Sequence, residues 1–426
     1  MEPTAPIISP LEIPRGFVNW IARSPGRPFL IIFVLALGVR GFFLTKVPES
    51  YVLPHDRWEM EAVAMALAER GEFADPYALP TGPTAHLPPI VPGILALVWR
   101  LFDMGRAAGY AAWILRIAGY SAMYAMIPWF AAHLGIARQA GIIAGLAGAL
   151  MAEWPGHGEA LTAIAMGLLA IAFSNRWSSA GNSPGGSLLL GLAAGASFHL
   201  QPALLPVVIG FMVFELWWSR DSRKWTLSAL IASGIVLACL PWGVRNYVRF
   251  DALFFVRSNL GLELRLAFHE GAAASMETMD AREEHRHPRT HEVEAKLVRE
   301  FGEVAYMRAA GRDAWGWMRA NPAESLQLIA SRIAHFWFGP LHRPGTAAAV
   351  TALTLLAFLG AWRTLPMLTV PQRAALLIPI ATYPLVYYFV TYMWRYRTPL
   401  NWLILLLACA AIWSRPDRVK DMGASI

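Results

Sequence analysis

Residues 28–46 decide the fold class, and they read PFLIIFVLALGVRGFFLTK. Arg40 is the one charged side chain before the closing Lys46, so the run is almost wholly apolar. A helix needs about 20 apolar residues to cross a bilayer, and this run is long enough. Further apolar runs follow, although several are shorter. We expect ten membrane-spanning helices, at residues 28–46, 110–133, 140–155, 159–175, 185–200, 203–218, 225–242, 347–362, 373–392 and 398–413.

The composition of the chain agrees with that assignment. The 426 residues are 56% hydrophobic and 15% charged, whereas soluble domains average about 45–50% apolar and about 25% charged. The formal net charge of +7 does not indicate nucleic-acid binding, because the basic residues lie in short clusters between the apolar runs. We therefore expect the lipid bilayer as a partner, and no nucleic acid.

The apolar run at residues 88–102 determines the topology, because counting it as a span would invert every later helix. The positive-inside rule places short basic clusters on the cytoplasmic side. All the clusters fall on the side of the N-terminus if residues 88–102 do not cross. We therefore expect this run to form an interfacial helix, with ten crossings and both termini cytoplasmic. The clusters lie at residues 15–27, 138, 176, 220–224, 363–373 and 415–420.

Two large external loops follow from this topology, and we expect the functional site where they meet. Helical periodicity at residues 294–310 and 322–338 predicts amphipathic helices on the membrane surface. We expect the polar, His-rich stretch 276–291 to be mobile. The predicted parts are a cytoplasmic segment (1–27), an N-terminal transmembrane module (28–242) with an acidic external loop (47–109), an external loop region (243–345), C-terminal transmembrane helices (346–413) and a cytoplasmic tail (414–426).

The strongest local motif follows the first span. Residues 55–60 read HDRWEM and place a carboxylate, Asp56, just outside the membrane. A helix and then a Pro-Pro helix would hold this carboxylate at the surface, beside a lipid head group. The later positions of the pattern are Ala64, Leu67, Gly71, Asp75-Pro76-Tyr77 and His86-Leu87-Pro88-Pro89. The pattern resembles the first external loop of the GT-C superfamily, the multispan glycosyltransferases that use polyprenyl-phosphate sugars, such as protein O-mannosyltransferases and aminoarabinose transferases.

Further matches to that superfamily recur in order along nearly the whole chain. The resemblance implies an all-α, GT-C-like bundle of about ten transmembrane helices, with amphipathic interfacial helices in the external loops. It also implies that the chain moves a hexose or pentose, with inversion, from a polyprenyl-phosphate donor to a glycan, lipid or protein acceptor on the external face. The matches are Arg116, Pro241-Trp242, Arg245-Asn246-Tyr247, Ser258-Asn259, Gly261, His335-Phe336-Trp337, Tyr383-Pro384 and Arg395-Tyr396-Arg397-Thr398-Pro399.

The resemblance implies roles for particular side chains. Asp56 matches the loop-one Asp that is the family's proposed general base, or that helps to bind a metal; Glu59 lies one turn further on as a second catalytic candidate. An acceptor hydroxyl needs such a base, while arginine forks or a divalent cation would neutralise the lipid phosphate. Asp56 could instead be a helix cap, Glu59 a surface charge, and the arginines anchors. The candidate clamp is Arg116, Arg245, Arg395 and Arg397.

The resemblance also implies a second acidic residue in the short external loop between the third and fourth spans, where this chain has Glu153, His157 and Glu159. The chain has no Asp-Glu or Asp-x-Asp pair there, so a divalent metal cofactor stays open. His86 is either a turn residue or an active-site donor, and Asn259 completes the substrate-binding candidates. The histidines of the second loop are not expected to bind metal, because arginines between them would repel a cation; they are His285, His287 and His291.

A transporter or flippase of a lipid-linked glycan is the alternative function. Such a protein should carry charges or broken helices at mid-membrane and often an internal repeat. The predicted spans are nearly free of ionisable residues at their centres, and the two halves of the chain do not resemble each other. A scaffold subunit that kept the fold and lost activity is a third possibility. The compact loops favour a bacterial inner membrane, with the site facing the periplasm or exterior.

Overall fold

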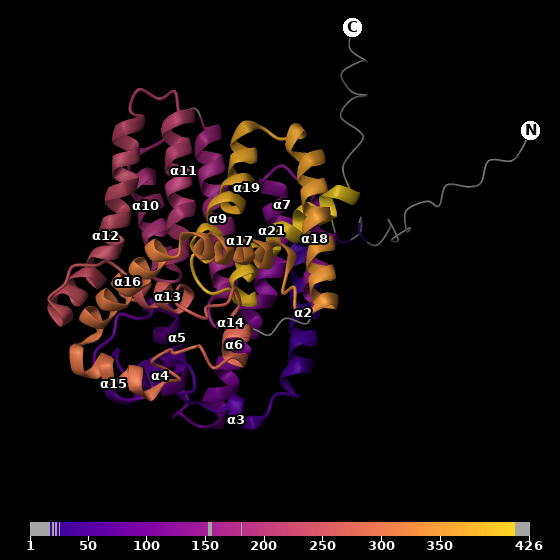
Figure 1. Ribbon diagram of the computed structural model, residues 1–426. Coiled ribbons are helices and arrows are strands. Elements are labelled where there is room, and N and C mark those ends of the chain that lie inside the picture. The colour runs from indigo at the N-terminus through magenta and orange to yellow at the C-terminus, as the bar shows by residue number, and fades with distance from the viewer. Residues whose placement is uncertain are drawn as a thin grey trace, which may run out of the picture.

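The computed structural model describes residues 18, 21, 24, 26–151, 156–179 and 181–413. In this part of the chain every regular element is a helix (Figure 1). The described residues form isolated β-bridges but no β-strand. The prediction of an all-α protein is confirmed for these residues. The predicted cytoplasmic segment at residues 1–27 and the tail at 414–426 lie mostly or wholly outside them.

Among the described residues, four helices are long and apolar enough to cross a membrane, which supports the prediction of an integral membrane protein. They are α2 (Gly26–Leu44), α9 (Glu159–Ser178), α12 (Lys224–Phe250) and α18 (Pro344–Thr364), the last extended by the 3-10 turn η2 (Leu365–Met367). The other six predicted spans coincide with shorter or less apolar helices: α6 (Arg106–Ala125) with α7 (Ile127–His133), α8 (Arg138–Leu150), α10 (Pro184–Phe198), α11 (Leu205–Trp218) after η1 (Pro202–Leu204), α19 (Val370–Thr382) with α20 (Leu385–Tyr388), and α21 (Thr398–Ile412).

Small residues let these helices approach closely, as is typical of helices that pack in lipid. A Cβ at Gly191 of α10 would lie 2.1 Å from the carbonyl oxygen of Ile231 in α12. A Cβ at Gly360 of α18 would lie 1.7 Å from the carbonyl oxygen of Leu407 in α21. Larger side chains at these positions would force the backbones apart. The apolar core is built around α21, whose side chains are almost all buried.

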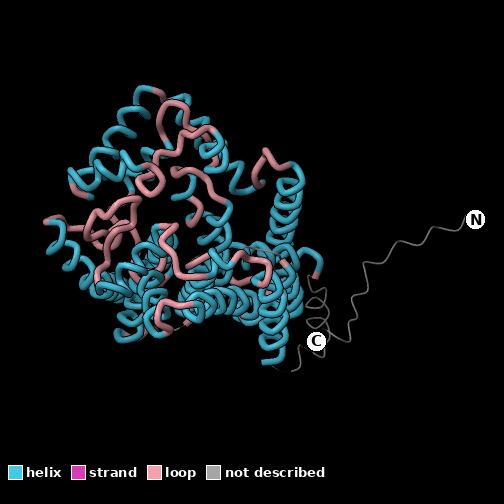
Figure 2. The backbone as a smooth tube through the Cα atoms, turned by 90° about the horizontal axis from the view of Figure 1, so that it is seen from below, coloured by secondary structure: helices cyan, strands magenta, loops and turns pink. Residues whose placement is uncertain are grey.

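The two long loops of the sequence gather at the lower end of the helix bundle in Figure 1, and Figure 2 views the molecule from that end. Gly302, with φ +81°, ends one predicted amphipathic helix and starts another, so the helix expected over 294–310 is divided. The helix expected over 322–338 is continuous. The elements here are α3 (Glu49–Val52), α4 (Glu59–Arg70), α5 (Ile90–Leu101), α13 (Leu260–Ala267), α14 (Met276–Ala281), α15 (Glu292–Phe301), α16 (Glu303–Ala320), α17 (Pro322–Phe338) and η3 (Trp394–Arg397).

Hydrogen bonds join the two loops into one unit. The Ala78 amide donates to the Pro288 carbonyl at 3.0 Å. The buried carboxylate of Glu303 accepts the Ala85 amide at 2.8 Å and the Ser258 hydroxyl at 2.6 Å. Burial raises the pKa of Glu303, although these hydrogen bonds oppose that effect. Segments about 200 residues apart in sequence thus meet at this end of the molecule.

Candidate functional site

The first turn of α4 carries two carboxylates that face in opposite directions. Glu59 and Glu61 are two residues apart, which is about 200° around a helix with 3.6 residues per turn. Glu61 turns toward α6 and the start of α9, whereas Glu59 turns toward histidines of the two loops. A single helical turn therefore contributes to two separate polar clusters.

Glu61 lies in a buried cluster with Arg116 of α6 and His157, which precedes α9. Its side chain is 2% exposed; it accepts a hydrogen bond from Arg116 Nη2 at 3.4 Å and pairs with His157 Nε2. Burial raises the pKa of Glu61, but His157 and Arg116 outweigh it and bring the pKa down to about 2. The carboxylate is therefore ionised at neutral pH, and its charge is compensated inside the protein.

One oxygen of this carboxylate has no protein partner. Glu61 Oε2 is buried and accepts no hydrogen bond from the described residues. Buried carboxylate oxygens normally accept at least one hydrogen bond, because losing water without compensation costs about 1–3 kcal/mol. Within the described residues this oxygen therefore keeps an unused capacity to accept a hydrogen bond.

A cavity of about 400 Å³ adjoins this cluster. Its polar lining comes mainly from Arg116, Tyr120 and His157, and most of its remaining surface is apolar. Ile94 and Leu115 are exposed residues that also lie in the lining, so the cavity reaches the surface of the bundle. The remaining lining residues are Phe33, Val91, Leu95, Val98, Ala112, Ala118, Gly119, Ala122, Gly156, Ala160, Leu161 and Ile164. We call this the α5–α6–α9 cavity.

Asp56, the predicted general base, lies on the surface. Its side chain is 71% exposed, and Arg289 Nη2 is 3.9 Å from its Oδ2. It does not line the α5–α6–α9 cavity. The alternative that Asp56 caps a helix is not seen either, because Trp58 occupies the N-cap position of α4 and no side chain caps it.

Of the four arginines predicted to clamp a phosphate, Arg116 lines the cavity and the other three lie elsewhere. Arg245 donates to the carbonyls of Phe73 and Thr84, at 3.1 and 2.7 Å, and so holds the first loop in place. Arg397 is buried and donates to Thr354 Oγ1 at 2.8 Å. Arg395 is 43% exposed, with its Nε 4.0 Å from Glu159 Oε1.

The remaining predicted residues are distributed over the loop end. Glu159 Oε2 accepts a hydrogen bond from the Gly158 amide at 3.1 Å, and Glu159 Oε1 faces Arg395. Asn259 is buried and donates to Glu263 Oε1 at 2.7 Å. Glu153 lies outside the described residues. Among the described residues, His157 and Glu159 do not form a group of metal-ligating side chains with a third residue.

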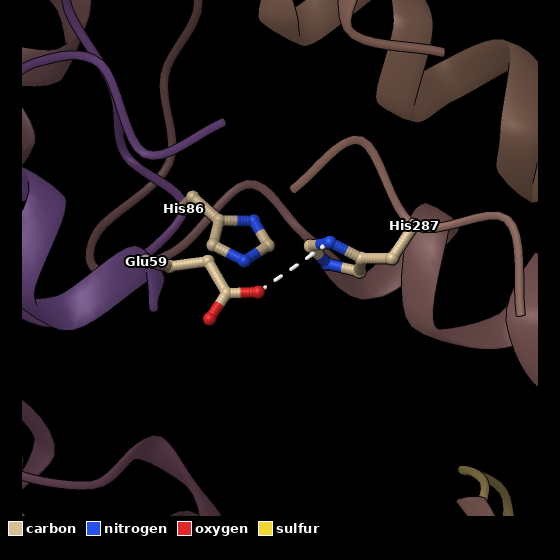
Figure 3. A group of neighbouring side chains, drawn as sticks. All are labelled: Glu59, His86 and His287. Carbon is tan, nitrogen blue, oxygen red and sulfur yellow. Dashed lines mark ion pairs between the residues drawn. The ribbon is translucent and has the colours of Figure 1, made fainter. Parts of the chain in front are cut away.

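A different group in the described residues has the composition of a metal site: Glu59, His86 and His287 (Figure 3). One donor atom from each lies within 4.8 Å of the others, and Glu59 Oε1 is 3.4 Å from His287 Nδ1. The Tyr77 hydroxyl is 3.1 Å from His86 Nδ1. Burial, followed by the nearby His287 and Arg257, holds the pKa of His86 well below its usual range, so its imidazole is neutral at pH 7.

Sequence reasoning missed Glu61 and His287. Glu61 could have been found, because a helix that begins Glu-x-Glu must send its two carboxylates to opposite faces. His287 lies in the stretch expected to be mobile, yet it is 6% exposed. Arg289 donates to the carbonyls of Arg57 and Tyr77 at 3.1 and 2.7 Å, and its positive charge is partly compensated by the Asp56 carboxylate at 3.9 Å.

Comparisons with known proteins add no identification. No family model matches the chain, and searches of curated proteins and of solved structures find no match. The GT-C resemblance therefore rests on the sequence motifs quoted above.

Proposed function

We propose that this chain is a membrane glycosyltransferase of the GT-C type, which moves a sugar from a polyprenyl-phosphate carrier to a glycan, lipid or protein acceptor. The observation that carries the proposal is the apolar α5–α6–α9 cavity beside the buried Glu61 cluster. Its volume of about 400 Å³ lies in the range of small-molecule sites. An apolar lining with a few polar groups suits a long hydrocarbon tail joined to a charged head.

Arg116 is the proposed phosphate ligand. Its side chain is 12% exposed and contributes a guanidinium to the cavity lining. A guanidinium fork matches phosphate oxygens, and the attraction strengthens where water is excluded. Glu61 holds this arginine in place. The leaving lipid phosphate would therefore depart toward a fixed positive charge, which favours cleavage of the bond from the sugar carbon.

His157 is the proposed base. The carboxylate of Glu61, with its pKa of about 2, is a poor proton acceptor at neutral pH, but it fixes the orientation of the His157 imidazole. The acceptor oxygen would attack the anomeric carbon, the bond from that carbon to the phosphate oxygen would break, and the hydroxyl proton would pass to Nδ1 of His157, because Nε2 donates to Glu61. Asp56 remains the candidate that the family resemblance implies, so the two side chains must be compared directly.

The transfer assay tests this function. Purified protein is incubated with a panel of radiolabelled polyprenyl-phosphate sugars and with detergent-solubilised membrane lipids from its host. We expect labelled product from one donor class and none with heat-inactivated protein. No transfer from any donor by folded protein would contradict the proposal, and flipping of lipid-linked glycans would be measured next.

The ten-span topology and its orientation belong to the same proposal. We place both loops on the external face, in a bacterial inner membrane. Single cysteines at positions 80 and 280 should react with an impermeant thiol reagent added outside cells, whereas one at 222 should react only after lysis. Opposite labelling would move the site to the cytoplasmic side.

A further inference from the structure

Glu59, His86 and His287 converge from three separate segments of the loop end. Glu59 begins α4, His86 precedes α5, and His287 lies between α14 and α15 (Figure 3). The side chain of Glu59 is 25% exposed and that of His287 is 8% exposed. Because His86 is also buried, the group lies in a largely enclosed site that water can still enter beside Glu59.

The distances are close to those of a zinc site. Zn²⁺ binds imidazole nitrogen and carboxylate oxygen at about 2.0–2.2 Å, so tetrahedral ligand atoms lie about 3.4 Å apart. Glu59 Oε1 and His287 Nδ1 already have that separation, 3.4 Å. The donors of the full group lie within 4.8 Å of one another, so small side-chain rotations would bring all three onto one ion.

Neighbouring groups prepare both imidazoles. The Tyr77 hydroxyl occupies His86 Nδ1, which leaves Nε2 of that ring for an ion, as second-shell partners do in metal sites. His287 Nδ1 faces the Arg289 amide at 3.0 Å and the Glu59 carboxylate at 3.4 Å. Because Nδ1 accepts a hydrogen bond from this amide, it carries no proton that it could donate to the Glu59 carboxylate. The lone pair of Nδ1 and the carboxylate oxygen therefore repel each other. A cation between Nδ1 and Glu59 would exchange that hydrogen bond for a metal bond and remove the repulsion.

The charges around the group permit a cation. Glu59 supplies a negative charge, and the positive charge of Arg257, which donates to the His86 carbonyl at 2.8 Å, is paired with Glu263 at 3.8 Å. The His285 ring lies 5.8 Å from that of His287, and its Nε2 is buried without a partner in the described residues.

We propose that Glu59, His86 and His287 form a binding site for a divalent transition-metal ion of the zinc class, which joins the first external loop to the second. Three protein ligands leave a fourth position for water. This site lies on the face of α4 opposite to Glu61, and it does not depend on the proposed transfer reaction.

Metal binding to the tag-free protein in detergent tests the site. The protein is stripped with a chelator, titrated with Zn²⁺, and the bound metal per chain is measured by mass spectrometry. We expect one saturable ion per chain in the wild type. Glu59→Gln, His86→Gln and His287→Gln should each weaken binding by about 100-fold or more, because removing a ligand should exceed the 10–100-fold cost of removing a second-shell partner.

His291→Gln is the matched control, because His291 lies on the same loop but outside the group. It should bind Zn²⁺ like the wild type. The wild-type titration decides the question even if a variant does not fold: absence of saturable binding would overturn the site. Wild-type affinity in the three ligand variants, or an equal loss in His291→Gln, would also overturn it. Sugar transfer is not measured, so this result is independent of the proposed function.

Discussion

The two faces of the first turn of α4 place similar carboxylates in different surroundings. Glu61 is almost fully buried and lies between a guanidinium and an imidazole. Glu59 is a quarter exposed and lies beside two imidazoles, of which His86 is neutral at pH 7. The protein therefore neutralises the charge of Glu61 internally, whereas Glu59 keeps contact with solvent and is the charge that the proposed metal ion would compensate. Burial and partners, and not residue type, determine what each carboxylate can do.

The largest expected effect is on sugar transfer, and it distinguishes His157, which pairs with Glu61, from the exposed Asp56 as the base. His157→Gln keeps a hydrogen-bond donor toward Glu61 but cannot accept a proton at neutral pH. Sugar transfer should fall by about 100-fold to 10⁴-fold, the usual contribution of a general base. Asp56→Asn should change transfer by less than about 10-fold, measured with the same donor. The reverse ranking would restore Asp56 as the base.

The next effect compares the stability contributed by the two carboxylates. Glu61→Gln removes the negative charge between Arg116 and His157, and breaking such a buried pair should cost about 3–5 kcal/mol. Glu59→Gln should cost less than about 1 kcal/mol in metal-free protein, because its side chain is partly solvated. Equilibrium unfolding in mixed micelles measures both. Equal losses would mean that the two faces are not energetically distinct.

Lowering the pH should selectively reduce the contribution of the Glu61 cluster to the free energy of unfolding. The folded-state pKa of Glu61 is about 2, below its ordinary value of 4.5. Its contribution to stability is therefore complete above pH 4.5 and is lost as the pH falls toward 2. At about 1.4 kcal/mol per pH unit, the loss amounts to about 3 kcal/mol. Glu61→Gln should lack this part of the acid destabilisation; an unchanged pH profile in that variant would contradict the assigned pairing.

The helices could be predicted well where local signals mark their ends. The helix over 322–338 begins with Pro322 and ends before Gly339, whose φ of +82° suits glycine. The break at Gly302 was missed, because apolar periodicity continues on both sides of it. Within the part of the chain that the structure describes, four helices have by themselves the length and hydropathy of a membrane span. The shorter ones match predicted spans in position, but their crossing stays a prediction.

The site was harder to predict, because its contacts join distant segments. Arg116 and His157 were selected singly, and the carboxylate that joins them was not. His287 is 228 positions after Glu59, and its polar neighbours predict exposure. Asp56 was favoured for its position after the first span, which does not reveal that its side chain turns to solvent. Periodicity predicts faces of helices, whereas a site needs the arrangement of several helices.

Photolabelling of the α5–α6–α9 cavity tests the central claim most directly. Purified protein is exposed to a photoreactive polyprenyl phosphate, and the labelled residues are mapped by mass spectrometry. We expect adducts on lining residues such as Ile94, Leu115 and Ile164, which an excess of unlabelled polyprenyl phosphate abolishes and which Gly119→Trp reduces by filling the cavity. Adducts elsewhere on the bundle, or labelling that unlabelled lipid does not compete, would contradict the account.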